Sequence, residues 1–444
     1  MNRLGHICLI AALSTGLCAS CLFAQSSEVK GSTNADSTAQ SPAVNAEEED
    51  TVQSSRVDGG QEQQFVAALN GSGLILMEDT LSRRLFLGAS FSGGWDSNPE
   101  NAGHGAASGM YTLSPYLGIR AKTPRTQYLL QYQPTITGYS SDVYARQTMN
   151  TASAFVVRDM SDRWKWDLKA TGSYGQDSTR FLAPQQTVVV GEVPGTGPNA
   201  ASYLPNAGTV TYIDGTLALH FRRSERDAFA LSASNSFNRN TGFNEESSVA
   251  STRLSSDRGL SPTLGLTAYG QASHYYGSLN CESFGGGIGV RWQARERTFF
   301  SLSGGPQLNT SICGKQQGFS YSAAFSTRLS RKSQMYMLSD YQPMTSYLGP
   351  GLWQRSASGG YQWQATTMGT LSVDLAYVSS NTLAAVSSYH GTYFDCVYSV
   401  HLRHGVTVLY SYRGAVSSAG GTSVSRNVAQ FSLVWSSNVG QLFQ

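Results

Sequence analysis

The histidines, cysteines and glycines of this chain do not stand in the motifs that catalytic, metal-binding or phosphate-binding sites require. His220, His274, His401 and His404 lie in no motif that pairs a histidine with a nucleophile or a carboxylate. The cysteines and histidines lack the spacing of metal ligands. The glycine run at 285–289 lacks the strand–turn–helix context of a phosphate-binding loop. We therefore expect no enzyme and no cofactor or metal site.

The charged residues instead recur on one face of alternating segments. The segment WKWDLKATGSY at 164–174 places tryptophan, leucine, alanine and tyrosine on one face and lysine, aspartate, threonine and serine on the other. This period of two predicts a β-strand. Aromatic residues at both ends of the apolar face, with aliphatic residues between them, are typical of a strand that faces lipid.

The composition favours many short strands around water. The chain has 444 residues, a formal net charge of +2 and 14% charged residues, whereas globular domains average about 25%. Uncharged polar residues suit the wall of a water-filled lumen. The near-neutral balance gives no reason to expect a nucleic-acid partner. No run of 18 apolar residues follows the N-terminus, so we expect no spanning helix.

The first 82 residues read as targeting and leader segments. Arg3, the apolar stretch Ile7–Leu17 and the small Ala24 predict a signal peptide at 1–24, with a lipoprotein site at Cys21 as the alternative. Residues 25–82 are polar and acidic and predict a disordered periplasmic leader, in which 61–80 forms either a short packed linker or a small plug. A signal peptide followed by membrane strands indicates a Gram-negative outer membrane.

Residues 83–444 predict the barrel itself. About eighteen alternating segments follow one another, each near the ten residues that a tilted membrane strand needs. We therefore predict an all-β, antiparallel, up-and-down transmembrane barrel of 16–18 strands. Short charged connections alternate with longer ones rich in Gly, Ser and Asn, such as 175–208 and 414–426, so the short ones should be periplasmic. The tryptophans at 164, 292, 363 and 435 should form the inner aromatic girdle.

Two segments resemble known outer-membrane patterns. The amphipathic strand at 428–435 ends on Trp435, similar to the terminal strand recognised by the barrel assembly machinery, although nine residues follow it. The segment GWDSNP at 94–99 resembles the start of the β-barrel porin families, some members of which are linked to exopolysaccharide loci. This resemblance implies an outer-membrane channel.

Residues on the wet face of the strands should line the lumen. They carry both charge signs, so we expect weak ion selectivity. The predicted lining residues are Arg120, Gln131, Gln133, Lys165, Asp167, Lys169, Asp214, Arg222, Arg291, Arg328, Asp340, Asp374, Asp395 and Arg413.

The upper loops contain two further candidates. The long connection at 175–208, with Arg180 and Glu192, either folds inward as a constriction or extends strands outward. Cys281 and Cys313 lie in consecutive upper loops and should form a disulfide on this oxidising side of the membrane. Cys396 shares a face with aromatic residues and should face lipid.

These patterns together favour a passive diffusion channel for small hydrophilic solutes. Tyr116, Tyr139 and Tyr269 on the wet face suggest saccharides. A barrel associated with exopolysaccharide export and a non-conducting structural barrel are the alternatives. The expected partners are outer-membrane lipid, lipopolysaccharide and the assembly machinery, and the pattern leaves open whether the chain forms a homo-oligomer.

Overall fold

The described part of the chain is a barrel. The computed structural model describes residues 85–100, 105–176, 208–241, 245–277, 280–294, 297–310, 317–346, 349–381, 389–402, 405–419 and 422–438. The chain divides into two units, Met1–Gln53 and Ser54–Gln444, and every described residue belongs to the second. The predicted signal peptide and leader lie outside the described residues.

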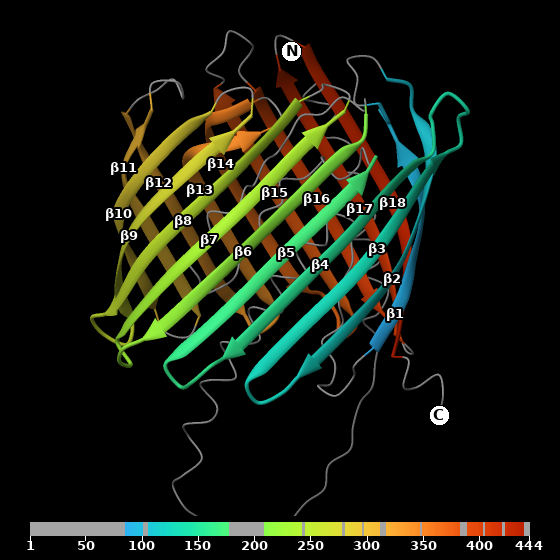
Figure 1. Ribbon diagram of the computed structural model, residues 1–444. Helices are drawn as coiled ribbons and strands as arrows, with labels where there is room; N and C mark the ends of the chain where they lie inside the picture. Colours follow the sequence, from blue (N-terminus) through green and yellow to red (C-terminus); the bar gives the residue numbers. More distant parts are fainter. Residues whose placement is uncertain are drawn as a thin grey trace, which may run out of the picture. The chain divides into compact units, whose positions relative to one another are not determined.

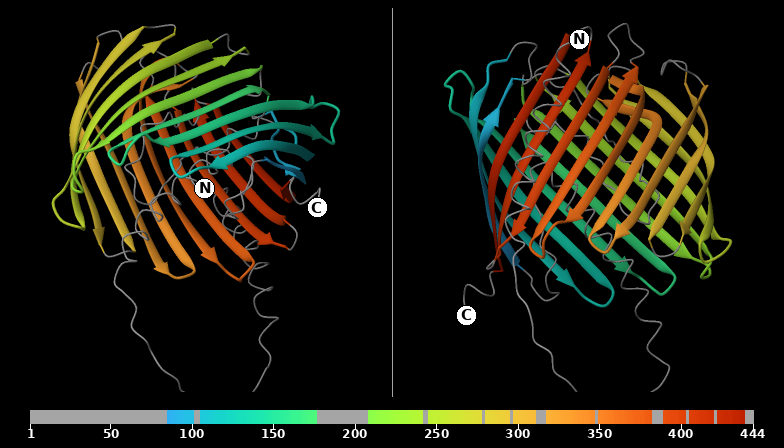
Figure 2. Two further views of the ribbon diagram at one scale, coloured as in Figure 1. Left: turned by 60° about the horizontal axis from the view of Figure 1, so that its bottom comes forward. Right: turned by 180° about the vertical axis from the view of Figure 1, so that it is seen from behind.

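Eighteen antiparallel strands follow one another around the barrel, and β1 pairs with both β2 and β18 (Figures 1 and 2). The sheet is therefore closed, and each of the eighteen predicted segments is confirmed as a strand. The strands are β1 Leu85–Asp96, β2 Ser108–Lys122, β3 Thr126–Tyr139, β4 Gln147–Asp159, β5 Trp164–Gly175, β6 Val210–Arg222, β7 Asp227–Asn240, β8 Glu245–Gly259, β9 Leu264–Tyr276, β10 Cys281–Ala294, β11 Thr298–Asn309, β12 Gln317–Ser330, β13 Ser333–Ser346, β14 Gly349–Gln364, β15 Gly369–Asn381, β16 Tyr389–His401, β17 Val406–Ala419 and β18 Thr422–Asn438.

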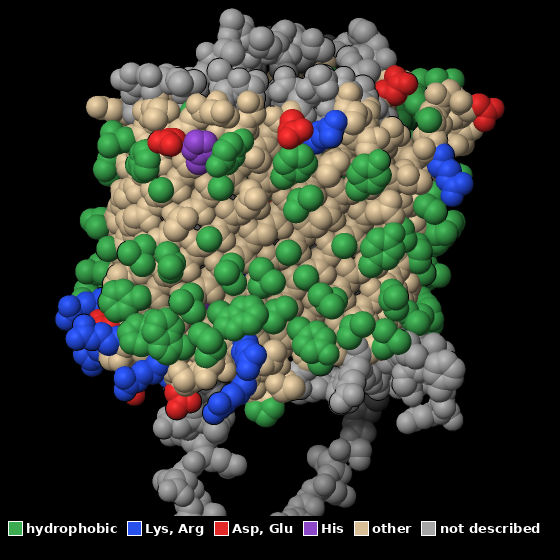
Figure 3. Space-filling model, in the orientation of Figure 1, with side chains coloured by type: hydrophobic (Ala, Val, Ile, Leu, Met, Phe, Trp, Pro, Cys, Tyr) green, Lys and Arg blue, Asp and Glu red, His purple; other side chains and the backbone are tan. Residues whose placement is uncertain are grey.

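The two faces of the sheet differ in the way that the alternation predicts. In β5, Trp164 and Tyr174 on one face are 39% and 60% exposed, whereas Asp167 and Ser173 on the other face are buried. Directly paired residues share a face of the sheet, so the register extends this assignment around the barrel. The outer surface carries the apolar side chains, which gather in a band near the lower end of the barrel (Figure 3). Within the described ranges, no helix is long and apolar enough to cross a membrane.

The end of the barrel that carries the eight short connections is called the short-turn end, and the opposite end the long-loop end. The turns at the short-turn end are built from a repeated local device. A hydroxyl oxygen accepts a hydrogen bond from the backbone N–H three residues later, from Thr126 to Thr123 (3.0 Å), from Asp227 to Ser224 (3.1 Å) and from Leu264 to Ser261 (3.0 Å). Serine and threonine stabilise tight turns in this way.

One predicted connection is wrong. The sequence suggested a loop at 414–426, but β17 continues to Ala419 and β18 begins at Thr422. The small and hydroxyl-bearing residues of this segment pair across the two strands, for example Ser417 with Val424. The strands therefore extend further toward the long-loop end than their apolar faces indicate.

The junction of β1 and β18, here called the seam, is held by the segment WDSNP. Asp96 and Arg426 are both fully buried and form a two-point ion pair, Nε to Oδ1 at 3.0 Å and Nη2 to Oδ2 at 2.5 Å. The backbone N–H of Asn98 donates to Asp96 Oδ1 (3.0 Å). Ser97 and Asn427 exchange two further hydrogen bonds, one from the N–H of each. The resemblance at 94–99 thus falls on residues that join the two ends of the sheet.

We expect Arg426→Leu to lower the free energy of unfolding by about 3–5 kcal/mol, because it leaves a buried carboxylate without its partner. The measurement is the urea midpoint of the folded chain in detergent micelles, followed by tryptophan fluorescence. The double variant Asp96→Leu/Arg426→Leu should recover part of the loss. Arg258→Leu, which removes an exposed arginine 3.9 Å from Asp227, is the control and should cost less than about 1 kcal/mol. Equal midpoints for both single variants would contradict this role of the seam pair.

Candidate functional site

The inner wall of the barrel is the candidate site. Cross-strand register places the side chains of all fourteen predicted lining residues on the face that carries Asp167 and Ser173. Near the short-turn end lie Arg120, Lys165, Asp167, Arg222, Arg291 and Arg328, and farther up the wall lie Gln131, Gln133, Lys169, Asp214, Asp340, Asp374, Asp395 and Arg413.

A cluster of charges occupies the middle of three neighbouring strands. Asp374 of β15 lies directly opposite Asp395 of β16, and Asp395 lies opposite Arg413 of β17. Arg413 Nε is 3.5 Å from Asp395 Oδ2, and these side chains are 8% and 23% exposed. The arginine thus offsets the repulsion between two adjacent carboxylates. The sequence placed each of these residues on the wall but gave no signal that they meet.

A glycine completes this cluster. The hydroxyl of Tyr336 in β13 donates to Asp374 in β15. The tyrosine side chain reaches Asp374 by passing over Gly360 of the intervening strand β14. A Cβ at position 360 would overlap both Tyr336 and Asp374. Asp374 also accepts from Ser372 Oγ at 3.0 Å. These bonds fix the carboxylate against the wall.

Other charged groups of the wall are also paired. His220 Nε2 is 2.6 Å from Asp167 Oδ1 across β5 and β6. The guanidinium of Arg253 lies 4.3 Å from the ring centre of Tyr269, and Thr267 donates to Asp257 at 2.5 Å. The sequence analysis missed Arg253, although it lies within the predicted strand 248–254, and it missed Asp257, which lies beyond the end of that segment. The pairing of charges favours a wall of mixed sign.

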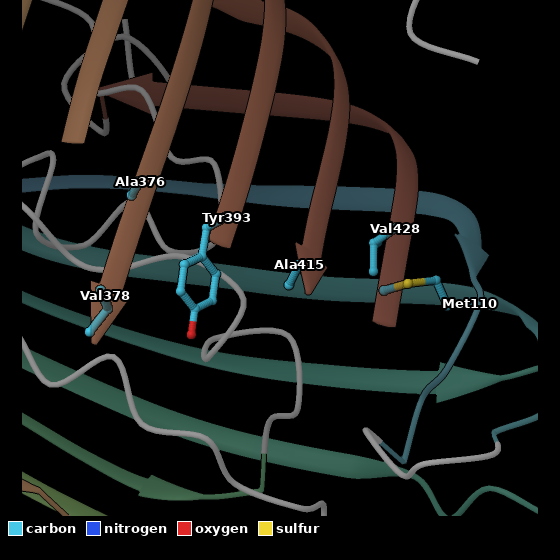
Figure 4. Close-up of a cluster of buried hydrophobic side chains, with 6 residues drawn as sticks. All are labelled: Met110, Ala376, Val378, Tyr393, Ala415 and Val428. Carbon is cyan, nitrogen blue, oxygen red and sulfur yellow. The ribbon is translucent and has the colours of Figure 1, made fainter. Parts of the chain in front are cut away.

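The upper part of the wall is apolar on one side. A buried cluster there comprises Met110, Ala376, Val378, Tyr393, Ala415 and Val428 (Figure 4). Met110 of β2 and Val428 of β18 approach each other across the seam, and the other four lie on β15, β16 and β17. The alternation alone predicted a polar inner wall, and this apolar cluster shows that the wall is not polar throughout.

A hairpin narrows the lumen at the long-loop end. The ends of β13 and β14 curve inward (Figure 2) and approach β8 and β9, which are not their neighbours in the sheet. Tyr275 of β9 donates its hydroxyl hydrogen to the carbonyl oxygen of Pro343 at 3.3 Å. Trp353 of β14 is 4% exposed and packs on Tyr341, with ring centres 5.0 Å apart.

The contact between this hairpin and the wall depends on a glycine, Gly318 of β12. A Cβ at Gly318, on the inner face of β12, would overlap the indole of Trp353. The outer face of the hairpin thus lies against the inner face of its neighbours. The sequence predicted inward folding for 175–208 instead, and that connection, with Arg180 and Glu192, lies outside the described residues.

Only one cysteine of the predicted disulfide, Cys281, lies in the described part of the chain. Cys281 is the first residue of β10 and is disulfide-bonded, and Cys396 is not part of a disulfide. Cys313 lies outside the described residues, so its pairing with Cys281 stays a prediction. Among the residues that the structure describes, no group of three potential metal ligands comes together.

The geometry defines a class of protein. A closed antiparallel barrel with an apolar outer surface and a polar, charge-bearing inner wall is a transmembrane β-barrel of the outer membrane. No family model matches the sequence, and no curated protein matches it either.

Several solved structures have a similar chain path at low sequence identity. They include the siderophore receptor PirA from Acinetobacter baumannii, with a TM-score of 0.42, 6% identity and 81% of both chains covered. OccAB4 from A. baumannii has a TM-score of 0.41 and 8% identity over 81% of this chain and 100% of that chain. OpdL from Pseudomonas aeruginosa has a TM-score of 0.42 and 9% identity over 80% and 99%. At such low similarity, what those proteins bind or transport does not extend to this chain.

We expect Gly318→Leu to displace the inward hairpin, because a side chain at position 318 would overlap the buried indole of Trp353. The measurement is the rate of tryptic cleavage after the exposed Arg355 in the folded protein, which should rise about ten-fold, since local opening limits proteolysis. Gly270→Leu is the matched control, because a Cβ there meets no atom within 4 Å. An unchanged rate in the Gly318 variant would show that the hairpin does not rely on this contact.

Proposed function

We propose that this protein is an outer-membrane channel for passive diffusion of small hydrophilic solutes. The observation that carries the proposal is the closed eighteen-stranded sheet with charged side chains in the middle of its inner wall. Barrels of sixteen to eighteen strands are wide enough to leave an aqueous path. Asp374, Asp395 and Arg413 place charge at mid-height of this wall, which is typical of a face that lies on an aqueous lumen and not on lipid.

The inward β13–β14 hairpin supports a limit on solute size. It occupies the lumen at the long-loop end and is anchored by Tyr275 and by the Trp353 packing. A solute that enters from outside must pass it. We therefore propose that this hairpin, together with or instead of the connection at 175–208, sets the narrowest section of the channel.

The solute class is best described as small and hydrophilic. The three tyrosines that suggested saccharides are engaged with the protein in different ways. Tyr116 is buried and donates to the carbonyl oxygen of Trp435 at 3.5 Å, Tyr139 packs on the apolar cluster, and Tyr269 lies under Arg253. Tyr116 offers almost no surface to a passing sugar, and the other two rings are partly covered by their neighbours, so mixed charge is the better guide to the solute.

The terminal strand supports the proposal of recognition by the barrel assembly machinery. Phe431, Leu433 and Trp435 of β18 are 47%, 43% and 37% exposed on the outer face. β18 is paired with β17 on one side and with β1 on the other. Recognition of its edge must therefore precede closure of the seam.

The first test is single-channel conductance in a planar bilayer. We expect stable ohmic steps from the folded chain, and a rise of about two-fold or more when residues 343–353 are replaced by Asn-Gly, because a wider section conducts more ions. This replacement joins the paired residues Gln342 and Gln354. The control shortens the β7–β8 hairpin between the paired Asn238 and Ser247 and should leave the steps unchanged. Silence from every variant would favour a non-conducting structural barrel over a channel.

The second test concerns the charge cluster. We expect Asp374→Asn/Asp395→Asn to lower the ratio of cation to anion permeability by about two-fold, because Arg413 then has no carboxylate on the two strands β15 and β16 beside it. The ratio follows from the reversal potential across a potassium chloride gradient. Asp142→Asn/Glu282→Gln, which removes two exposed carboxylates at the long-loop end, is the charge-matched control. A larger shift in the control would place the selectivity at the mouth.

A further inference from the structure

The two ends of the barrel differ in exposed charge. At the long-loop end the described, exposed charged residues are Glu100, Asp142, Glu246, Glu282, Arg146, Arg239 and Arg355, four acidic and three basic. At the short-turn end the basic ones are Arg125, Arg158, Arg163, Arg222, Arg223, Arg226, Arg258, Arg297, Arg328, Arg331 and Lys332, and the acidic ones are Asp159, Asp162 and Glu225. The described residues at the short-turn end thus include eleven exposed basic residues and three exposed acidic ones, whereas the long-loop end is nearly balanced.

The turn device accounts for part of this difference. In three short turns the residue just before the hydrogen-bonded N–H is basic, namely Arg125, Arg163 and Arg226. Lys332 holds the same place in the turn between β12 and β13, where its own N–H donates to Ser330 Oγ at 3.1 Å. The repeated turn therefore places a basic residue at the same point of these four hairpins, whereas the turn at Ser261 has Thr263 there. Tight turns do not require arginine or lysine there, so a functional reason is needed.

An exposed row of aromatic rings lies directly above one part of this basic end. Trp164, Phe221 and Phe229 are paired in register on the outer face of β5, β6 and β7. The ring centres are 4.6 Å apart for the first pair and 6.5 Å for the second. Trp164 and Phe229 are 39% and 37% exposed. We call these three residues the aromatic row.

Arginines border the aromatic row on the side toward the turns. The side chain of Arg258 in β8 is 75% exposed, and its Nε lies 3.9 Å from Asp227 Oδ1 in a long ion pair. Arg223 and Arg226 lie in the turn between β6 and β7. We call Arg223, Arg226 and Arg258 the arginine fringe. Figure 3 shows lysine and arginine side chains clustered below the band of large apolar side chains at the lower left.

We propose that the aromatic row and the arginine fringe form a binding site for an anionic phospholipid of the periplasmic leaflet. Aromatic rings at this depth lie where acyl chains meet headgroups. Guanidinium groups bind phosphate oxygens through two donors at once, and basic residues at a membrane surface attract anionic lipid. A soluble anion would gain nothing from the aromatic row, which favours a ligand that has both an apolar and a phosphate part.

Carboxylates also lie in this region, and the balance of charge between them and the basic residues decides which headgroup is favoured. Asp162, Glu225 and Asp227 lie among the basic residues, and Asp227 already accepts from Ser224 Oγ at 3.1 Å. The excess of arginine at this end favours a headgroup with net negative charge over a zwitterionic one. The proposal depends on the membrane orientation of the barrel and is independent of whether the lumen conducts.

The test is native mass spectrometry of the folded full chain in detergent micelles, titrated with phosphatidylglycerol or with phosphatidylcholine of the same acyl chains. We expect tighter binding of phosphatidylglycerol, and a loss of about five-fold or more in its affinity in Arg223→Gln/Arg226→Gln/Arg258→Gln, because each cation contributes separately. Phosphatidylcholine binding should stay unchanged in that variant, which also shows that the barrel is folded.

The matched control is Arg125→Gln/Arg297→Gln/Arg331→Gln, which removes the same charge from three separate turns. It should change phosphatidylglycerol affinity by less than about two-fold, because those arginines do not share one aromatic row. Equal losses in both triple variants would overturn the site and leave only a general basic surface. Displacement of the lipid by inorganic phosphate, or equal binding of both lipids by the unsubstituted chain, would overturn it as well.

Discussion

The structure depends on one constraint, that no backbone hydrogen-bonding group may face lipid without a partner. An open sheet would leave the edges of β1 and β18 unpaired, and each unpaired group would cost several kcal/mol in a hydrocarbon environment. Pairing of β1 with β18 removes both edges. The buried ion pair of Asp96 and Arg426 stands at this junction, where it fixes which residues meet and so sets the register of closure.

Closure in turn decides what the inside can do. Once the sheet is a barrel, every second residue of every strand faces a common space, and side chains from distant parts of the sequence meet there. The carboxylates at 374 and 395 stand beside Arg413 for this reason. The inward hairpin uses the same space, and it packs its outer face on the wall because Gly318 leaves room for Trp353.

The two ends serve different surroundings, and the local sequence reflects this. Short turns at one end follow a compact hydroxyl-based design that places cations at the membrane boundary. At the other end strands run on beyond their apolar faces, as β17 and β18 do. The aromatic row and the arginine fringe thus arise from turn chemistry and strand alternation acting side by side.

The sequence alone determined the number of strands to within two, their order and the face of the lining residues that it assigned. It could do so because alternation and turn residues are local properties, and a barrel of consecutive hairpins adds no long-range choice of partner except at the seam. Only the tertiary structure decided how Asp96 meets Arg426, how three charges gather at mid-lumen, and which hairpin folds inward. Those contacts depend on stagger between strands and on the space left at single glycines such as Gly318 and Gly360, and neither quantity is encoded in the residues of one segment.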